Sequence, residues 1–180
     1  LASIAEENDA SMFLFQIADR TKAKYVQRLL NLTRDLRVPY LFIKESHEVD
    51  FSHIAVSVSF LEEDKEKATF ASAFGRFFSS NITLITANDY GSKAQTHTNV
   101  IASLFDKFNL AYTYQKAEKD SFGIDKEVVS KAHAQGFSMI MLSATREYGL
   151  DDLLFGPKER GLVQQSTVPI LLINPRGGLY

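Results

Sequence analysis

The sequence predicts an α/β protein with an open, mostly parallel five-stranded sheet and helices on both faces, preceded by part of a second copy of this unit. Two observations predict this fold class. Short apolar runs without polar alternation recur along the chain, as in strands that are buried on both faces. Amphipathic helical patterns separate the runs, as in units where a helix connects two parallel strands.

From residue 54 onward, the predicted strands are 54–59, 82–87, 111–117, 139–142 and 168–173. The predicted helices between them are 64–79, 94–108, 124–135 and the segment after Pro157. Strand 82–87 is rich in β-branched residues, whereas 111–117 is more polar and suits an edge of the sheet. In helix 64–79, Phe74, Phe77 and Phe78 fall at core-facing spacing. Gly136 follows helix 124–135 in the position that a C-cap glycine prefers.

Composition narrows the class of function. Lys and Arg total 20 against 22 for Asp and Glu, so we predict no nucleic-acid partner, which would favour a basic surface. The sequence contains 0 cysteines, which excludes disulfides, thiolate metal sites and thiol catalysis. No apolar run approaches the roughly 20 residues that span a bilayer. We therefore predict no membrane partner, and the composition fits a cytoplasmic protein.

The first part of the chain repeats the pattern of the last part. Ser11-Met12 corresponds to Ser138-Met139, and Val38-Pro39 corresponds to Val168-Pro169. The offset is about 130 residues, which is the size of one domain. The sequence therefore predicts a chain from a longer tandem protein, with a carboxyl-terminal remnant of a first repeat at 1–46, a linker at 47–53 and a complete domain at 54–180.

The segment 138–175 combines a strand, a polar loop, Phe155-Gly156-Pro157, a helix and a second strand. In this segment the chain resembles the universal stress protein family. The last unit of that family holds a loop of the form Gly, two residues, Gly, nine residues, Gly-Ser. Anchored on Gly156, the pattern falls on Ser143, Arg146, Gly156 and Pro157. The resemblance implies an adenine-nucleotide alpha-hydrolase-like fold and a role in stress response.

The positions that would bind a nucleotide depart from the family pattern. In nucleotide-binding relatives the first strand ends in an aspartate, and the corresponding residue here is Ser59. Ser143 and Arg146 replace two loop glycines, and Pro157 has no backbone N–H to donate to a phosphate. The resemblance therefore implies the branch of the family that does not bind ATP. We predict no cofactor and no enzymatic activity.

An alternative function is a sensor that binds ATP, AMP or another anion through the loop after the fourth strand. Arg146, Lys158 and Arg160 lie near one predicted helix N-terminus, where an anion is favoured. The interpretation that we favour is that they face solvent and are balanced by acids such as Glu147 and Glu159. The candidate nucleotide or anion site comprises Ser59, Ser143, Arg146, Gly156, Lys158 and Arg160.

Catalytic and metal-binding residues are not predicted. Ser143 follows a strand but lacks the Gly-x-Ser-x-Gly elbow of a nucleophile. His47 and His53 flank acidic residues of the linker without the spacing of metal ligands. His97 and His133 fall within predicted helices, and nothing in the sequence pairs them with a nucleophile.

Assembly or partner binding is the predicted mode of action. Members of the family typically dimerise through the last strand, and this chain has two such strands, 38–43 and 168–173. Because an unpaired apolar strand is prone to aggregate, we expect the two to pair within one chain as a pseudo-two-fold sheet. Self-association through these strands, or an unidentified protein partner, is expected. A regulatory domain of a larger transporter or signalling protein is a third possibility. The two strands are bounded by Val38 and Ile43, and by Val168 and Ile173.

Overall fold

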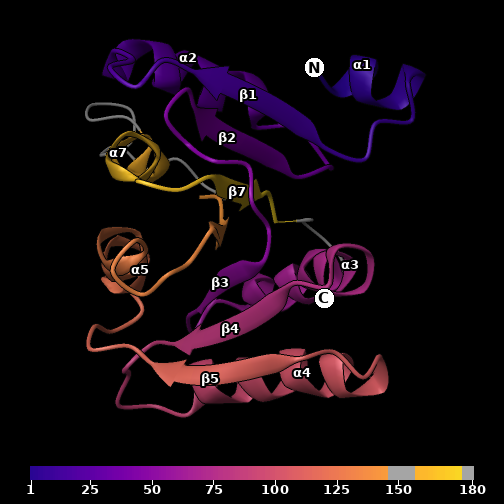
Figure 1. The fold of residues 1–180 in the computed structure, drawn as a ribbon, viewed down its shortest axis with the longest axis vertical. Coiled ribbons are helices and arrows are strands. Elements are labelled where there is room, and N and C mark those ends of the chain that lie inside the picture. The colour runs from indigo at the N-terminus through magenta and orange to yellow at the C-terminus, as the bar shows by residue number, and fades with distance from the viewer. Residues whose placement is uncertain (146–156, 176–180) are drawn as a thin grey trace.

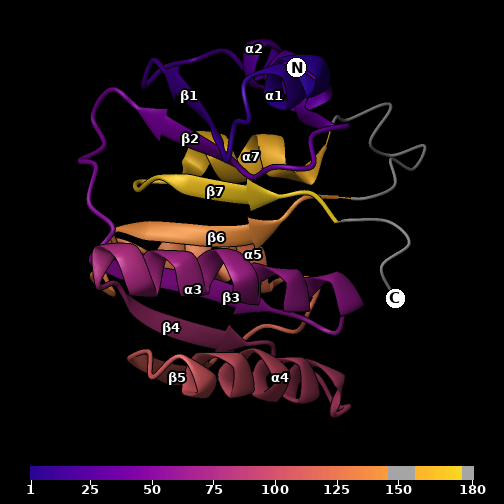
Figure 2. The ribbon, with the colours of Figure 1, turned by 90° about the vertical axis from the view of Figure 1, so that its right-hand side faces the viewer.

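The computed structural model describes residues 1–145 and 157–175 and shows a seven-stranded sheet with helices on both faces (Figures 1 and 2). The strands are β1 Phe13–Ile17, β2 Tyr40–Lys44, β3 His53–Val58, β4 Asn81–Thr86, β5 Tyr112–Lys116, β6 Met139–Ser143 and β7 Ile170–Ile173. The helices are α1 Ala2–Glu7, α2 Ala23–Thr33, the 3-10 helix η1 Glu62–Glu66, α3 Lys67–Phe78, α4 Lys93–Lys107, α5 Ile124–Lys131 and α7 Lys158–Gln165. Among these helices, none is both long enough and apolar enough to cross a lipid bilayer.

The strands lie in the order β1-β2-β7-β6-β3-β4-β5. Every neighbouring pair is parallel except β2 and β7, so the sheet is mostly parallel as predicted. The polar strand β5 lies at an edge, which agrees with its composition. The predicted count of five strands is too low for the sheet as a whole, because β1 and β2 extend the same sheet beyond β7.

The join between β2 and β7 confirms that the two apolar strands pair within one chain. Their antiparallel register pairs Tyr40 with Leu172, Leu41 with Leu171 and Phe42 with Ile170. Leu41 and Leu171 are fully buried at the centre of the join. Because β2 also pairs with β1, and β7 with β6, each of the two strands has a neighbour on both sides.

The buried apolar side chains form one cluster on each face of the sheet. Figure 2 shows helices on both of these faces. Phe42, Leu142 and Leu172 belong to the layer beneath α2, α5 and α7. Val56 and Met141 belong to the layer beneath α3 and α4. These apolar runs contain no alternation because successive side chains point to opposite faces and both faces are covered.

Helix α3 differs from its prediction at both ends. It begins with the 3-10 turn of η1, and Phe77 and Phe78 are 75% and 58% exposed rather than core-facing. The side of α3 that packs on the sheet includes Ala71 and ends at Phe74. Phe78 instead contacts Phe74 from outside, with ring centroids 5.5 Å apart. Helical spacing indicates the side of the helix on which these residues lie, but it does not indicate how far along the helix the buried surface extends.

The end of β2 and the start of the predicted linker are anchored to the body of the protein. Lys44 Nζ donates hydrogen bonds to the carbonyl oxygens of Gln164 and Ser166, at 2.6 and 2.7 Å. His47 Nε2 lies 3.3 Å from the Ser166 carbonyl oxygen. These groups bind the last carbonyls of α7, where a cation also complements the helix dipole. The first 47 residues are therefore held to the rest of the chain by a helix cap as well as by the sheet.

Candidate functional site

The candidate site lies at the carboxyl edge of the sheet between β3 and β6. From β3 the chain builds the sheet through β4 to β5, and it then returns to the other side of β3 to form β6 and β7. Open α/β sheets bind ligands where the strand order reverses in this way. Ser59 follows β3 and Ser143 ends β6, so the fold brings these two predicted site residues to the reversal point.

A buried carboxylate occupies this position. Asp64 Oδ2 accepts hydrogen bonds from the backbone N–H of Ser59 and from its hydroxyl, the latter at 2.6 Å. Asp64 Oδ1 accepts a hydrogen bond from the Ser143 hydroxyl at 2.7 Å. Asp64 is only 2% exposed, and both serines are buried. Ser59 and Ser143 are thus brought together through a side chain of the protein itself.

Lys67 neutralises this carboxylate. Its Nζ lies 2.8 Å from Asp64 Oδ1 and also donates a hydrogen bond to the Ser57 carbonyl oxygen. The two residues lie three positions apart where η1 continues into α3, and that spacing puts them on the same side of the helix. Lys67 is 1% exposed, so the pair is shielded from water. Burial alone would raise the pKa of Asp64, but the Lys67 ammonium and the serine hydrogen bonds outweigh it and lower the pKa.

Polar contacts extend from this pair to both faces of the sheet. Ser57 Oγ donates a hydrogen bond to Asp125 at 2.9 Å, and Asp125 also lies 3.2 Å from Lys158 Nζ. On the other side, the ring nitrogens of His97 lie 3.1 Å from the Ser59 carbonyl oxygen and 3.2 Å from Glu62. Within the described residues, every buried side-chain nitrogen and oxygen has a hydrogen-bond partner. The buried polar side chains of this network are therefore hydrogen-bonded within the protein itself.

The loops over the rest of this edge are also joined. Ser121, in the loop after β5, accepts a hydrogen bond from the Phe60 backbone N–H at 2.9 Å. The Ser121 backbone N–H and hydroxyl both donate to the carboxylate of Asp89, in the loop after β4. The loops after β3, β4 and β5 are therefore linked to one another by internal hydrogen bonds.

A second buried carboxylate lies at the loop after β6. Glu159, in the first turn of α7, is 2% exposed. Its Oε1 accepts hydrogen bonds from the backbone N–H and the hydroxyl of Thr145. Burial raises the pKa of Glu159, and the Thr145 hydrogen bonds and the Lys158 charge offset this only in part. Glu159 was expected only as one of the acids that balance the nearby cations, and its burial was not predicted.

The cations of the predicted anion site do not converge within the described residues. Lys158 Nζ pairs with Asp125, whereas Arg160 Nη1 donates a hydrogen bond to Gln27 of α2 at 3.2 Å. Lys158 remains exposed and Arg160 is half-buried. Arg146 and Gly156, the other members of the predicted loop site, lie outside the described residues.

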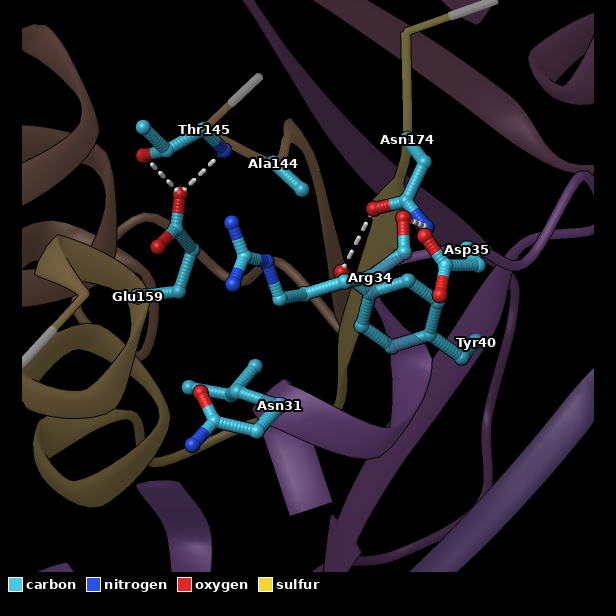
Figure 3. Close-up of a pocket in the computed structure, with 9 residues that line it drawn as sticks. Asn31, Arg34, Asp35, Tyr40, Ala144, Thr145, Glu159 and Asn174 are labelled. Carbon is cyan, nitrogen blue, oxygen red and sulfur yellow. Dashed lines mark hydrogen bonds between the residues drawn. The ribbon is translucent and has the colours of Figure 1, made fainter. Parts of the chain in front are cut away.

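A polar cavity of about 310 Å³ lies beside this region, between β2, β7 and the helices α2 and α7 (Figure 3). The Arg34 side chain extends into it from the end of α2, toward Thr145 and Glu159. Tyr40 donates its hydroxyl proton to Asn174 Oδ1 at 2.9 Å, and Asn174 Nδ2 donates to the Thr33 carbonyl oxygen at 2.6 Å. None of the residues that bind Asp64 lines this cavity. The cavity is therefore separate from the Asp64 site and lies where β2 pairs with β7.

The missed site residues share one property. Asp64, Lys67 and Glu159 are charged residues within charge-rich helical segments, and such residues usually face solvent. His97 was assigned to a helix without a partner, and it is 3% exposed. A faint signal was available for Asp64, because it lies five residues after the strand end at Ser59, at the start of a helix. That position favours an acidic side chain without showing that it is buried.

No protein-family model matches the sequence, and no curated protein matches it. Solved structures do match the fold. A universal stress protein from Archaeoglobus fulgidus superposes with a TM-score of 0.72 over 98% of this chain and 64% of its own, at 14% identity. A putative universal stress protein from Pseudomonas aeruginosa gives 0.61 over 97% of this chain and 66% of its own, at 11% identity.

A third structure, a universal stress protein in complex with cAMP, gives a TM-score of 0.54 at 8% identity. It covers 69% of this chain and 98% of its own length. This chain therefore spans less than two thirds of the two longer structures and almost all of the shorter one. These similarities show that the chain has the fold of universal stress proteins.

Proposed function

We propose that this chain is a universal-stress-protein-like, cytoplasmic stress-response protein that acts through assembly or partner binding, without nucleotide binding or catalysis of its own. The fold it shares with universal stress proteins supports the family assignment. The segment 138–175, on which the resemblance is based, contains β6, α7 and β7 in the predicted order of strand, helix and strand.

The buried Asp64 carboxylate is the observation that carries this proposal. It occupies the reversal point between β3 and β6 and takes the Ser59 N–H and the Ser143 hydroxyl. A phosphate at this edge would need donors of this kind, and here the protein supplies the anion itself. Lys67 already neutralises that anion at 2.8 Å. A nucleotide phosphate would have to displace a buried, fully bonded ion pair, which is energetically costly.

Glu159 supports the same conclusion at the loop after β6. Its carboxylate accepts the Thr145 N–H, close to the start of α7. In a phosphate-binding loop, backbone N–H groups at a helix N-terminus would point to the ligand. An internal carboxylate therefore takes a backbone donor at each of the two places where the resemblance would put a nucleotide.

We also propose that the chain contains the end of one repeat and the whole of another. The antiparallel join pairs Leu41 with Leu171, the residues that correspond at the repeat offset of about 130 residues. Helices α2 and α7, which occupy corresponding places, pack against each other. The shorter structure, the complex with cAMP, covers 69% of this chain. This is close to the fraction of the chain that the proposed domain 54–180 occupies. The boundaries 1–46, 47–53 and 54–180 remain predictions.

Calorimetric titration with magnesium ATP, AMP and cAMP tests the proposal. We expect no heat and no change in unfolding temperature up to about 1 mM ligand, which corresponds to a binding free energy weaker than about −4 kcal/mol. cAMP is included because one structure of the same fold is a complex with it. Binding at micromolar strength would contradict the proposal.

The alternative, an anion or nucleotide sensor, makes a different prediction for the same titration. Binding that is lost in Arg146→Ala or Lys158→Ala, but retained in Lys126→Ala on the exposed face of α5, would favour it. The exposure of Lys158, which is 47% for the side chain, is the observation in its favour. Its pairing with Asp125 is the observation against it.

A further inference from the structure

Three aromatic side chains, Phe60, Tyr90 and Phe122, reach the surface from the loops at the carboxyl edge of β3, β4 and β5, and we call them the aromatic patch. Phe122 is 84% exposed, and its ring packs edge-on against that of Phe60, with centroids 5.4 Å apart. Tyr90 is also exposed. These three strands are the ones furthest from β1, as Figure 1 shows. The aromatic patch therefore lies at the opposite end of the sheet from the strand that a first repeat would extend.

The loop that carries Phe122 is held in place. Asp120 Oδ1 accepts hydrogen bonds from the backbone N–H groups of Phe122 and Gly123, both at 3.1 Å. A Cβ at Gly123 would lie 2.9 Å from the Cβ of Lys119, so the turn is tightly closed as well. Ser121 joins this loop to the loops after β3 and β4. An aromatic side chain on an ordered loop loses little conformational entropy when a partner binds to it.

Acidic side chains surround the aromatic patch. The segments that connect β3 to α3, β4 to α4 and β5 to α5 contain six acids besides the buried Asp64, but only two lysines, Lys65 and Lys119. A cleft of about 400 Å³ beside the patch is lined by three of these acids. Two of the six pair with lysines at the surface, where such pairs are weak and can exchange partners. The excess of carboxylates favours a positively charged partner. The six acids are Glu62, Glu63, Glu66, Asp89, Glu118 and Asp120.

A second group of exposed aromatic rings has a cation of its own. The Arg76 guanidinium lies over the rings of Phe77 and Phe108, 5.5 and 5.0 Å from their centroids. Phe77 is 75% exposed, so its exposure is similar to that of Phe122. In the part of the chain that the structure describes, no lysine or arginine lies in this way over Phe122 or Tyr90. The aromatic patch thus offers ring faces that are surrounded by carboxylates and lack a cation, and such faces attract cations.

We infer that the aromatic patch docks a basic segment of another protein, with a lysine or arginine side chain over the Phe122 ring beside the Asp120 carboxylate. This inference rests on the proposed function, because it names the surface and the class of partner through which the chain would act. An exposed aromatic side chain with a polar rim is typical of the residues that dominate the binding energy of protein interfaces. A second copy of this chain fits the patch less well, because a two-fold contact would bring two acidic rims together.

An NMR titration of the full chain with two short capped peptides tests this surface. The basic probe is Gly-Lys-Leu-Arg-Lys-Gly, and the control probe has glutamate in place of each base. The basic peptide should shift the amide signals of Phe60, Tyr90 and Phe122 and leave that of Phe77 in place, whereas the acidic peptide should shift none of them. Raising the salt concentration from about 50 to about 500 mM should weaken the binding, because exposed charges are screened.

Two matched variants locate the binding. Phe122→Ser should weaken the binding of the basic peptide about fivefold or more, because it removes the ring face, whereas Phe77→Ser should leave the affinity unchanged. The two side chains are 84% and 75% exposed, so circular dichroism should show both variants folded. No binding of the basic peptide, or equal binding of the acidic peptide, would overturn the inference.

Three further outcomes separate this inference from the proposed function. Binding of the basic peptide that Phe122→Ser leaves intact would overturn the patch but leave partner binding standing. A dimer of the chain alone that Phe122→Ser abolishes in sedimentation would assign the patch to a second copy and overturn the basic partner. Micromolar nucleotide binding in the calorimetric titration would overturn the proposed function, whatever the peptides show.

Discussion

Asp64 and Glu159 are two buried carboxylates in similar local settings that hold their charge differently. Each accepts a backbone N–H and a hydroxyl from a residue near the carboxyl end of a strand: Ser59 directly after β3, and Thr145 two residues after the end of β6. Each is 2% exposed. Yet the pKa of Asp64 is lowered and that of Glu159 is raised.

The difference comes from what lies on the other side of each carboxylate. Lys67 Nζ lies 2.8 Å from Asp64 and is itself buried, so their attraction is weakly screened. Lys158 also acts on Glu159, but it is half exposed and pairs with Asp125. A backbone N–H and a hydroxyl thus do not offset the effect of burial on the pKa of Glu159, whereas the Lys67 ammonium together with the serine hydrogen bonds does so for Asp64.

The largest expected effect comes from removing the buried ammonium. Lys67→Met leaves Asp64 buried without its counter-ion, which should lower the free energy of unfolding by about 3–5 kcal/mol at neutral pH. Urea denaturation measures this. The loss should shrink in acid, because Asp64 in the variant takes up a proton at higher pH than in the parent.

Lys65→Ala is the matched control for this change. Lys65 pairs with Glu62, an exposed carboxylate in the same turn, so this variant should unfold at the same urea concentration as the parent. Equal losses in the free energy of unfolding for both variants would mean that the buried Asp64–Lys67 pair stabilises the protein no more than the exposed Lys65–Glu62 pair.

A smaller effect should follow from removing one hydroxyl donor to the charged carboxylate. Ser143→Ala deletes the 2.7 Å hydrogen bond to Asp64 and should cost about 1.5–3 kcal/mol, the range for hydrogen bonds to charged groups. Ser130→Ala, which removes an exposed hydroxyl on α5, is the control and should be close to neutral. Thermal unfolding of the two variants in parallel distinguishes them, and a neutral Ser143→Ala would argue against the network.

The smallest effect has the opposite sign. Because the pKa of Glu159 is raised on folding, its contribution to stability is present below its ordinary pKa and is lost as pH rises through the folded-state value. Glu159→Gln keeps an oxygen acceptor for Thr145 and removes the charge. It should therefore be more stable than the parent at pH 7 and close to the parent near pH 4.

Unfolding at both pH values tests this sign. Destabilisation of Glu159→Gln at pH 7 would show that the ionised carboxylate is stabilising, and the contrast with Asp64 would then fail. For Asp64, whose pKa is lowered, the sign is reversed: its contribution is present above the ordinary pKa and is lost as pH falls through the folded-state value.

Much of the candidate site could not be predicted for a physical reason. Ser59 and Ser143 lie together because residues at the carboxyl ends of adjacent parallel strands meet at one edge of a sheet. Asp64 and Lys67 lie in the run Glu-Glu-Asp-Lys-Glu-Lys, in which every residue is charged. Sequence alone does not tell which members of such a run face inward. That depends on how η1 is oriented over the sheet.

The sequence by itself determined the order and type of most elements, because apolar runs that are buried on both faces and amphipathic helices each carry their own periodicity. It also determined that the apolar strands at 38–43 and 168–173 need partners. The tertiary structure was needed to show the antiparallel register in which β2 and β7 pair, the single sheet of seven strands that results, and the burial of Asp64 and Glu159. These outcomes depend on contacts between residues far apart in the chain, and local patterns do not encode such contacts.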